Sequence, residues 1–172
     1  MRQLDGKFGF LNYEVSAGQL ARWLDEIGVP EDRLFQVNLR GRRNPVANDQ
    51  DKTALARLLL GHEVEALAVD PFGRAYTGAS QNDPGEVAAW FVELDQFVRN
   101  QVGAKDLFLS AHAGWNGERT RGASSLEDWA DSIITIPETT ATTATRNATS
   151  GPSGETSNLK KTSSPSTPAH GH

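Results

Sequence analysis

The sequence predicts an α/β protein, a three-layer sandwich with a mainly parallel sheet between helices. Three short apolar runs carry this prediction, at Phe8–Tyr13, Ala66–Val69 and Leu107–Ala111. Runs this short and continuously apolar are typical of strands buried on both faces, as in a parallel sheet. Helical patterns separate the runs, and the connections are long enough for right-handed βαβ crossovers.

The first half of the chain alternates strand and helix. After the first strand, Ser16 is predicted to cap a helix that Gly28 ends. Its apolar stripe comprises Leu20, Trp23, Leu24 and Ile27. A second strand is predicted at Leu34–Leu39, and a helix from about Asp49 to Leu60 is expected to turn Leu55, Leu58 and Leu59 inward.

The second half repeats the alternation. A turn-rich loop at 71–78 follows the Asp70 strand, and Asp83 with Pro84 predicts the start of a helix that ends at Gly103. The broad apolar stripe of this helix contains Val87, Trp90, Phe91, Leu94, Phe97 and Val98. Such a stripe indicates core packing against a sheet.

The last elements before the composition changes are a short helix at about Ser124–Trp129 and a final strand at Ser132–Ile136. Residues 137–172 are dominated by Thr, Ser, Pro, Gly and Ala, with Leu159 as the single large aliphatic side chain. Such a segment buries too little apolar surface to offset its chain entropy. The sequence therefore predicts one domain at 1–136 and a disordered tail at 137–172.

Composition limits the classes of function. The 172 residues include no cysteine, which excludes a disulfide framework and thiolate metal sites. No apolar run approaches the ~18 residues of a membrane span, and the N-terminus lacks the layout of a signal peptide, so a cytoplasmic protein is expected. The net charge of -5 argues against nonspecific DNA binding by the whole surface. Arg40, Arg42 and Arg43 form the one basic cluster of the predicted domain, and a solvated loop is its simpler interpretation.

Titratable side chains follow the three apolar runs. Glu14 follows the first run, Asp70 ends the second, and His112 follows the third. Ligands of open α/β sheets bind at the carboxyl ends of the strands, so the two carboxylates and the imidazole predict one shared site. The alternative is structural, because polar residues end many strands and cap the helices that follow them.

Several segments together resemble a known family. Phe10–Glu14 and Leu67–Asp70 are followed by His112, by Arg121–Leu126 and by Asp131, in this order. The set resembles the RecA-fold ATPases of the RepA type, which are hexameric replicative helicases of plasmids and phages, and relatives described as AAA-family ATPases. The resemblance covers about residues 6–136.

The resemblance implies a role for each site residue. Glu14 would orient and polarise the water that attacks the γ-phosphate of ATP, and Asp70 would hold Mg²⁺ through water. His112 would contact the γ-phosphate, and Arg121 would reach a neighbouring subunit's nucleotide as an arginine finger, a role for which Arg119 competes. Asp131 is expected to be structural. Related ATPase subunits and single-stranded DNA are the implied partners.

The sequence departs from this family at the phosphate-binding loop. The family's motif is Gly-x-x-x-x-Gly-Lys-Ser/Thr, and no such motif is present. Gly6-Lys7 is followed by Phe8 instead of a hydroxyl residue. In the family's fold the strand before this loop lies beside the strand that corresponds to Leu107–Ala111. We therefore expect a truncated or split gene product that binds ATP weakly and is inactive alone.

Three hypotheses follow for the function. The first is a partial ATPase from a DNA-replication helicase that another polypeptide completes. The second is a noncatalytic interaction module that joins a related hexameric ATPase. The third is a metal-dependent hydrolase that uses Glu14, Asp70 and His112, and it ranks last because local metal motifs usually contain a second histidine.

Overall fold

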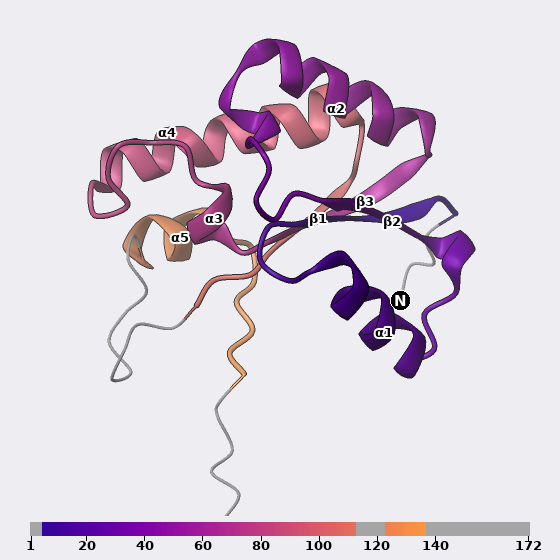
Figure 1. Cartoon of the computed structure of the whole chain (residues 1–172). Helices are drawn as coiled ribbons and strands as arrows, with labels where there is room; N and C mark the ends of the chain where they lie inside the picture. Colours follow the sequence, from indigo (N-terminus) through magenta and orange to yellow (C-terminus); the bar gives the residue numbers. More distant parts are fainter. Residues whose placement is uncertain (1–4, 113–122, 137–172) are drawn as a thin grey trace, which may run out of the picture. The chain divides into compact units, whose positions relative to one another are not determined.

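The protein is described by a computed structural model, which places residues 5–112 and 123–136 (Figure 1). Contacts along the chain define two units, residues 1–134 and residues 135–172. The fold below is that of the first unit. The tail predicted at 137–172 lies outside the described residues, and so does the loop at 113–122 that contains Arg119 and Arg121.

Strands and helices alternate along the described chain, as the sequence predicts. The elements are β1 (Lys7–Asn12), α1 (Ala17–Glu26), β2 (Leu34–Asn38), α2 (Asp49–Gly61), β3 (Val64–Asp70), α3 (Phe72–Ala75), α4 (Pro84–Asp95), the π-helical segment η3 (Gln96–Val102), β4 (Asp106–Leu109) and α5 (Ala123–Trp129). Two short 3-10 turns, η1 (Glu31–Arg33) and η2 (Pro45–Ala47), precede β2 and α2. None of the helices in the described part is long and apolar enough to cross a bilayer.

The four strands form one parallel sheet in the order β2-β1-β3-β4. Helices α2 and α4 lie over one face of the sheet and α1 lies on the other (Figure 1). This arrangement confirms the predicted α/β class and is that of a RecA-like three-layer sandwich. Because all four strands are parallel, their carboxyl ends share one edge of the sheet.

The predicted helix boundaries follow from local capping. The Ser16 hydroxyl accepts a hydrogen bond from the Gln19 amide at 3.3 Å. The Asp83 carboxylate accepts from the amides of Gly85 and Glu86 at 2.8 and 3.0 Å. Both bonds satisfy amides that have no partner inside the first helical turn. At the other end of the α4 helix, Gly103 with φ of 78° follows η3.

Three sequence predictions need correction. Residues 132–136 form no strand, and the described sheet consists of β1 to β4 alone. The connection after Asp70 contains the short helix α3, which begins with a buried Phe72. Leu58 is 44% exposed instead of inward, and in the stripe of α1 Trp23 is 48% exposed. Apolar periodicity indicates which face of a helix can be buried, and the neighbouring elements decide whether it is.

The main core lies between the sheet and helices α2 and α4. Leu11, Leu67 and Val69 of the sheet are at most 1% exposed, as are Phe91 and Leu59 of the helices. The core also contains a cluster of aromatic rings, Phe72, Tyr76, Trp90, Phe91 and Trp129. The Trp129 ring stacks on Phe91 with a centroid distance of 4.5 Å, and this contact fixes α5 against α4.

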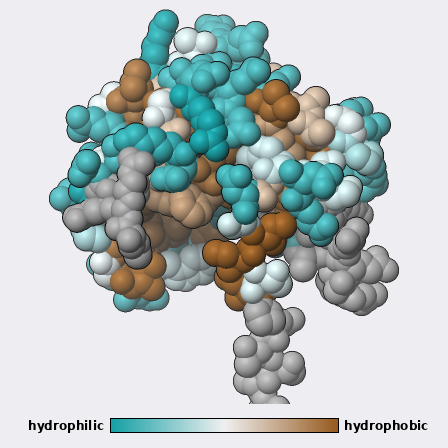
Figure 2. All heavy atoms as spheres, turned by 180° about the vertical axis from the view of Figure 1, so that it is seen from behind, coloured by the Kyte–Doolittle hydropathy of each residue, from teal (hydrophilic) through white to brown (hydrophobic). Residues whose placement is uncertain are grey.

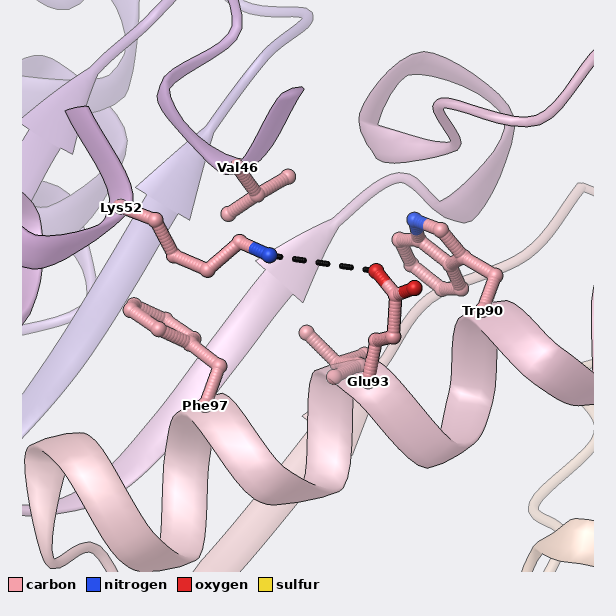
Figure 3. A pocket seen from close by; sticks show the side chains of 6 residues that line it. Val46, Lys52, Trp90, Glu93 and Phe97 are labelled. Carbon is pink, nitrogen blue, oxygen red and sulfur yellow. Dashed lines mark ion pairs between the residues drawn. The ribbon is translucent and has the colours of Figure 1, made fainter. Parts of the chain in front are cut away.

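A lysine connects the two helices above the sheet (Figure 3). Lys52 of α2 points between Val46, Trp90 and Phe97, and its ammonium group lies 3.8 Å from the Glu93 carboxylate of α4. The same ammonium lies 3.7 Å from Asp49. The aliphatic stem covers apolar surface while the charge keeps two carboxylate partners, so this contact is structural.

Candidate functional site

The carboxyl edge of the sheet is joined by backbone hydrogen bonds that continue past the strand ends. The Tyr13 amide donates to the Asp70 carbonyl at 2.9 Å, and the Phe72 amide donates to the Ser110 carbonyl at 2.8 Å. On the outer side, the Leu39 amide donates to the Asn12 carbonyl at 2.7 Å. The residues that follow all four strands are therefore held in a fixed relation to one another.

Glu14 and His112 meet at this edge. The His112 Nε2 atom lies 2.9 Å from the Glu14 Oε2 atom, although 98 residues separate them in the sequence. Both side chains remain accessible to solvent, with 37% of the Glu14 side chain and 74% of the His112 side chain exposed. The structure thus brings together two of the residues predicted for the site and leaves them open to a ligand.

Asp70 is the last residue of β3, and β3 lies between the strands that precede Glu14 and His112. Its carboxylate accepts a hydrogen bond from the Ser110 hydroxyl, which follows β4. The sequence did not single out Ser110 as a site residue, although it is the polar residue that interrupts the apolar run before His112. The edge therefore presents two side-chain pairs, Glu14 with His112 and Asp70 with Ser110.

Asn12 fixes the turn that carries Glu14, and sequence reasoning missed it. Its side chain is fully buried. The amide group donates to the Val15 carbonyl at 2.7 Å and to the Asn38 side chain at 2.9 Å. Its carbonyl oxygen accepts from the backbone amides of Val15 and Glu14, at 3.0 and 3.3 Å. A buried amide with all these partners restrains the backbone at Glu14.

Tyr13 holds the same turn from the opposite side. Its hydroxyl donates to the Asn44 side chain at 3.0 Å, and the Asn44 amide donates to the Ala75 carbonyl at 2.8 Å. Burial raises the pKa of the Tyr13 phenol far above its usual value, because the charged phenolate would be poorly solvated there. Tyr13 therefore stays neutral and acts as a hydrogen-bond donor.

The remaining predicted residues lie elsewhere. Arg121 and its competitor Arg119 fall outside the described residues. Asp131 follows α5 and is exposed. Lys7, the lysine of the Gly6-Lys7 dipeptide, begins β1 and so lies at the opposite edge of the sheet from Glu14. The dipeptide therefore lies away from the edge that carries Glu14.

The oxygen donors at the edge are compatible with a hydrated magnesium ion. The Asp70 carboxylate and the Ser110 hydroxyl are hard oxygen ligands, the class that Mg²⁺ prefers. Across residues 5–112 and 123–136, no three His, Asp or Glu side chains converge as a metal-binding group. A Mg²⁺ ion held here would therefore keep water or phosphate oxygens for most of its ligands.

Fold and edge together define a class of protein, namely α/β domains that bind ligands at the carboxyl ends of parallel strands. The model of a family described as AAA domain matches residues 2–118. The chain therefore belongs to the AAA domain family, whose members are ATPases of the P-loop type. No curated protein matches the sequence. Membership implies nucleotide binding in the family generally, and it agrees with the predicted AAA-family relationship.

Proposed function

We propose that this chain supplies the water-activating and metal-holding part of an ATPase site, and that it hydrolyses ATP when another segment supplies a phosphate-binding loop. The observation that carries the proposal is the 2.9 Å contact between Glu14 and His112 beside Asp70. These are the positions that the resemblance to RepA-type ATPases assigns to chemistry. Their convergence from β1, β3 and β4 supports a common site.

Each residue has a defined task in this proposal. Glu14 accepts a hydrogen bond from the attacking water and orients it toward the γ-phosphate. Asp70, positioned by the Ser110 hydroxyl, would hold the Mg²⁺ ion, which neutralises phosphate charge when bound. His112 donates to the γ-phosphate from the same edge and, without nucleotide, contacts Glu14. Arg121 of a neighbouring subunit would act as the arginine finger, and Asn12 keeps the turn at Glu14 in place.

More specifically, we propose that the chain is part of a DNA-replication helicase of the RepA type. Such a helicase would act on single-stranded DNA together with related ATPase subunits. The predicted basic cluster supports a place for DNA contact. Arg42 and Arg43 line an open groove of about 400 Å³ between the end of β2 and helix α2. Arg43 also pairs with Asp51. Basic side chains beside an open groove can hold the phosphates of a nucleic-acid strand.

A second candidate function is a noncatalytic module that joins a related hexameric ATPase. The absence of a Gly-x-x-x-x-Gly-Lys-Ser/Thr motif favours it, because phosphate capture in this fold depends on the amides and the lysine of that loop. The metal-dependent hydrolase is less well supported, since no three suitable ligands converge in the described residues.

The test is a reconstituted ATPase. A separate polypeptide with the phosphate-binding strand, loop and helix of an AAA-domain relative is co-expressed with this chain. Turnover and binding of Mg·ATP are then measured for the wild type and for Glu14→Gln. We expect Glu14→Gln to lower turnover by about 100-fold or more and to leave nucleotide affinity nearly unchanged. Glutamine keeps the shape of the side chain but cannot activate the attacking water.

The matched control is Glu26→Gln, which removes an exposed carboxylate from the end of α1. This variant should leave both the turnover and the affinity for Mg·ATP unchanged. Normal turnover of Glu14→Gln in the reconstituted enzyme would refute the assignment. Loss of nucleotide affinity together with turnover would mean that Glu14 holds the nucleotide and does not activate water.

A further inference from the structure

The open groove between the end of β2 and helix α2 has an apolar floor and a basic rim. The floor contains Val37 and Leu39 at the end of β2, and Leu55 and Leu58 of α2. Leu58 is 44% exposed in this groove, although leucine is usually buried. On the face seen in Figure 2, hydrophobic side chains show in separate patches among hydrophilic ones. The groove therefore offers a ligand apolar contact at a place where positive charge is also close.

The arginines near the groove differ in whether their charge is already neutralised. Arg43 forms an ion pair with Asp51, and the same carboxylate accepts a hydrogen bond from the Asn48 side chain at 2.7 Å. Arg42 lines the groove beside this pair and is exposed. Within the described part of the chain, neither Arg42 nor Arg40 has a carboxylate partner. Two guanidinium charges thus remain available to an anion, in a protein whose net charge is -5.

The loop that carries these arginines is held in place by hydrogen bonds. The Asn44 side chain accepts from the Tyr13 hydroxyl at 3.0 Å and donates to the Ala75 carbonyl at 2.8 Å. The Arg42 amide donates to the Leu39 carbonyl at 2.9 Å, which closes the turn after β2. A ligand that meets a fixed loop does not have to order the loop on binding. The backbone of the basic rim is therefore preorganised.

A pair of rings continues the same strand face toward the amino end of β2. Phe35 lies two residues before Val37, so both side chains project to the same face of the sheet. The rings of Phe35 and His62 stack with a centroid distance of 3.8 Å, and both residues are partly exposed. From Phe35 to Leu39 the chain spans about 13 Å. This face of β2 thus presents, in order, an aromatic pair, an apolar floor and a basic rim.

We propose that this groove binds a single strand of DNA, with phosphates on Arg40 and Arg42 and bases against the apolar floor. A polyanion meets guanidinium groups that have no carboxylate partner, which is the charge complementarity of a phosphate contact. The ring faces of unpaired bases are free to contact apolar and aromatic side chains, whereas a duplex hides them by stacking and pairing. The groove therefore selects a single strand over a duplex.

Arg43 has a different task from its neighbours. Its ion pair with Asp51 neutralises a carboxylate that lines the groove and would otherwise repel phosphate. Arg43 is thus a structural residue of the groove, and Arg40 and Arg42 make the phosphate contacts. This binding mode rests on the helicase part of the proposed function for the identity of the strand. It needs neither ATP nor a phosphate-binding loop, so the chain by itself is expected to bind.

Fluorescence anisotropy of a labelled oligothymidine of about 12 nucleotides, titrated with the full chain, tests the phosphate contacts. Two neutralised phosphates predict that the logarithm of the binding constant falls with the logarithm of the salt concentration with a slope of about -1.4. Arg42→Gln should reduce this slope to about -0.7 and weaken binding by about fivefold at about 50 mM salt. The matched control is Arg22→Gln, which removes an exposed arginine of α1 on the other face of the sheet and should change neither quantity.

The apolar floor is tested separately by Leu58→Gln. This variant should weaken oligothymidine binding by about threefold or more and leave the salt slope unchanged, because an apolar contact releases no counterion. Leu60→Gln is the matched control, since Leu60 is 59% exposed on the same helix and does not line the groove. A DNA duplex of the same length should bind at least about tenfold more weakly than the single strand.

The proposal is overturned if the full chain binds no oligothymidine at low salt, or if the duplex binds as tightly as the single strand. It is also overturned if Arg22→Gln and Leu60→Gln weaken binding as much as Arg42→Gln and Leu58→Gln. A labelled polyglutamate peptide that binds more tightly than oligothymidine would show that the groove takes an acidic protein segment instead. Because no ATP is present, failure of DNA binding is distinct from failure of the reconstituted ATPase.

Discussion

The two faces of the sheet differ in how completely they are covered. On the face beneath α2 and α4, Leu67 and Val69 are at most 1% exposed. On the other face only α1 provides a helical layer within the described residues, and Phe108 remains 53% exposed (Figure 1). The strands are apolar toward both faces. An apolar strand can be buried on both faces. The elements packed against each face determine how exposed its side chains are.

The largest difference is expected between two core truncations. Leu67→Ala on the covered face should lower the free energy of unfolding by about 3 kcal/mol, because it removes a fully buried side chain and leaves a cavity. Phe108→Ala on the open face should cost less than about 1 kcal/mol, since half of that ring is already in water. Urea unfolding of both variants measures the difference. If the two variants lower the free energy of unfolding equally, β4 is covered on both faces.

Asn12 is a polar residue of β1 that is nevertheless fully buried. Asn12→Ala should lower the free energy of unfolding by about 2 kcal/mol, since it leaves the Glu14 and Val15 amides without their acceptor. The control is Asn82→Ala in an exposed loop, which should change stability by less than about 0.5 kcal/mol. If the two variants unfold at the same urea concentration, the network around Asn12 does not restrain this turn.

The smallest effect is expected at Glu65, a half-buried residue near the amino end of β3. The backbone amide of Gly6 and then Lys105, 3.2 Å away, lower the pKa of Glu65 by favouring its charged form. A carboxyl group whose pKa is lowered by folding contributes stability above its usual pKa, and loses it as the pH falls through the folded value.

Glu65→Gln should therefore lower stability slightly at neutral pH and reduce the loss of stability on acidification below the usual carboxylate range. Unfolding midpoints measured between acidic and neutral pH provide the check, with Glu26→Gln as the control. Identical pH profiles for wild type and Glu65→Gln would show that this ion pair does not affect stability.

Much of the fold could be predicted from local patterns. The strand ending at Asp70 and the helices capped by Ser16 and Asp83 follow from short apolar runs and from hydrogen-bonding side chains at helix starts. The strand predicted at 132–136 was wrong because a ladder needs a neighbour, and no local pattern says whether one is present. The exposure of Leu58 was missed for the same reason, since it depends on what lies across from α2.

The candidate site could be predicted in part. Three parallel strands had to end at one edge, so the meeting of Glu14 and His112 followed from the fold class. Asn12 and Ser110 were missed, because their importance arises from the register that places Asn12 beside Asn38 and Ser110 beside Asp70. Register is a property of paired strands and has no signal in either strand alone.

The most direct test of the account is the rate of Mg²⁺-dependent ATP hydrolysis by this chain, alone and combined with a separately made phosphate-binding strand, loop and helix. The edge with Glu14, Asp70 and His112 is proposed to activate water but to lack the amides and lysine that hold the phosphates. We predict no hydrolysis above buffer for the chain alone and Mg²⁺-dependent turnover for the combination. Hydrolysis by the chain alone would contradict the account, as would a combination that binds Mg·ATP and yet never turns it over.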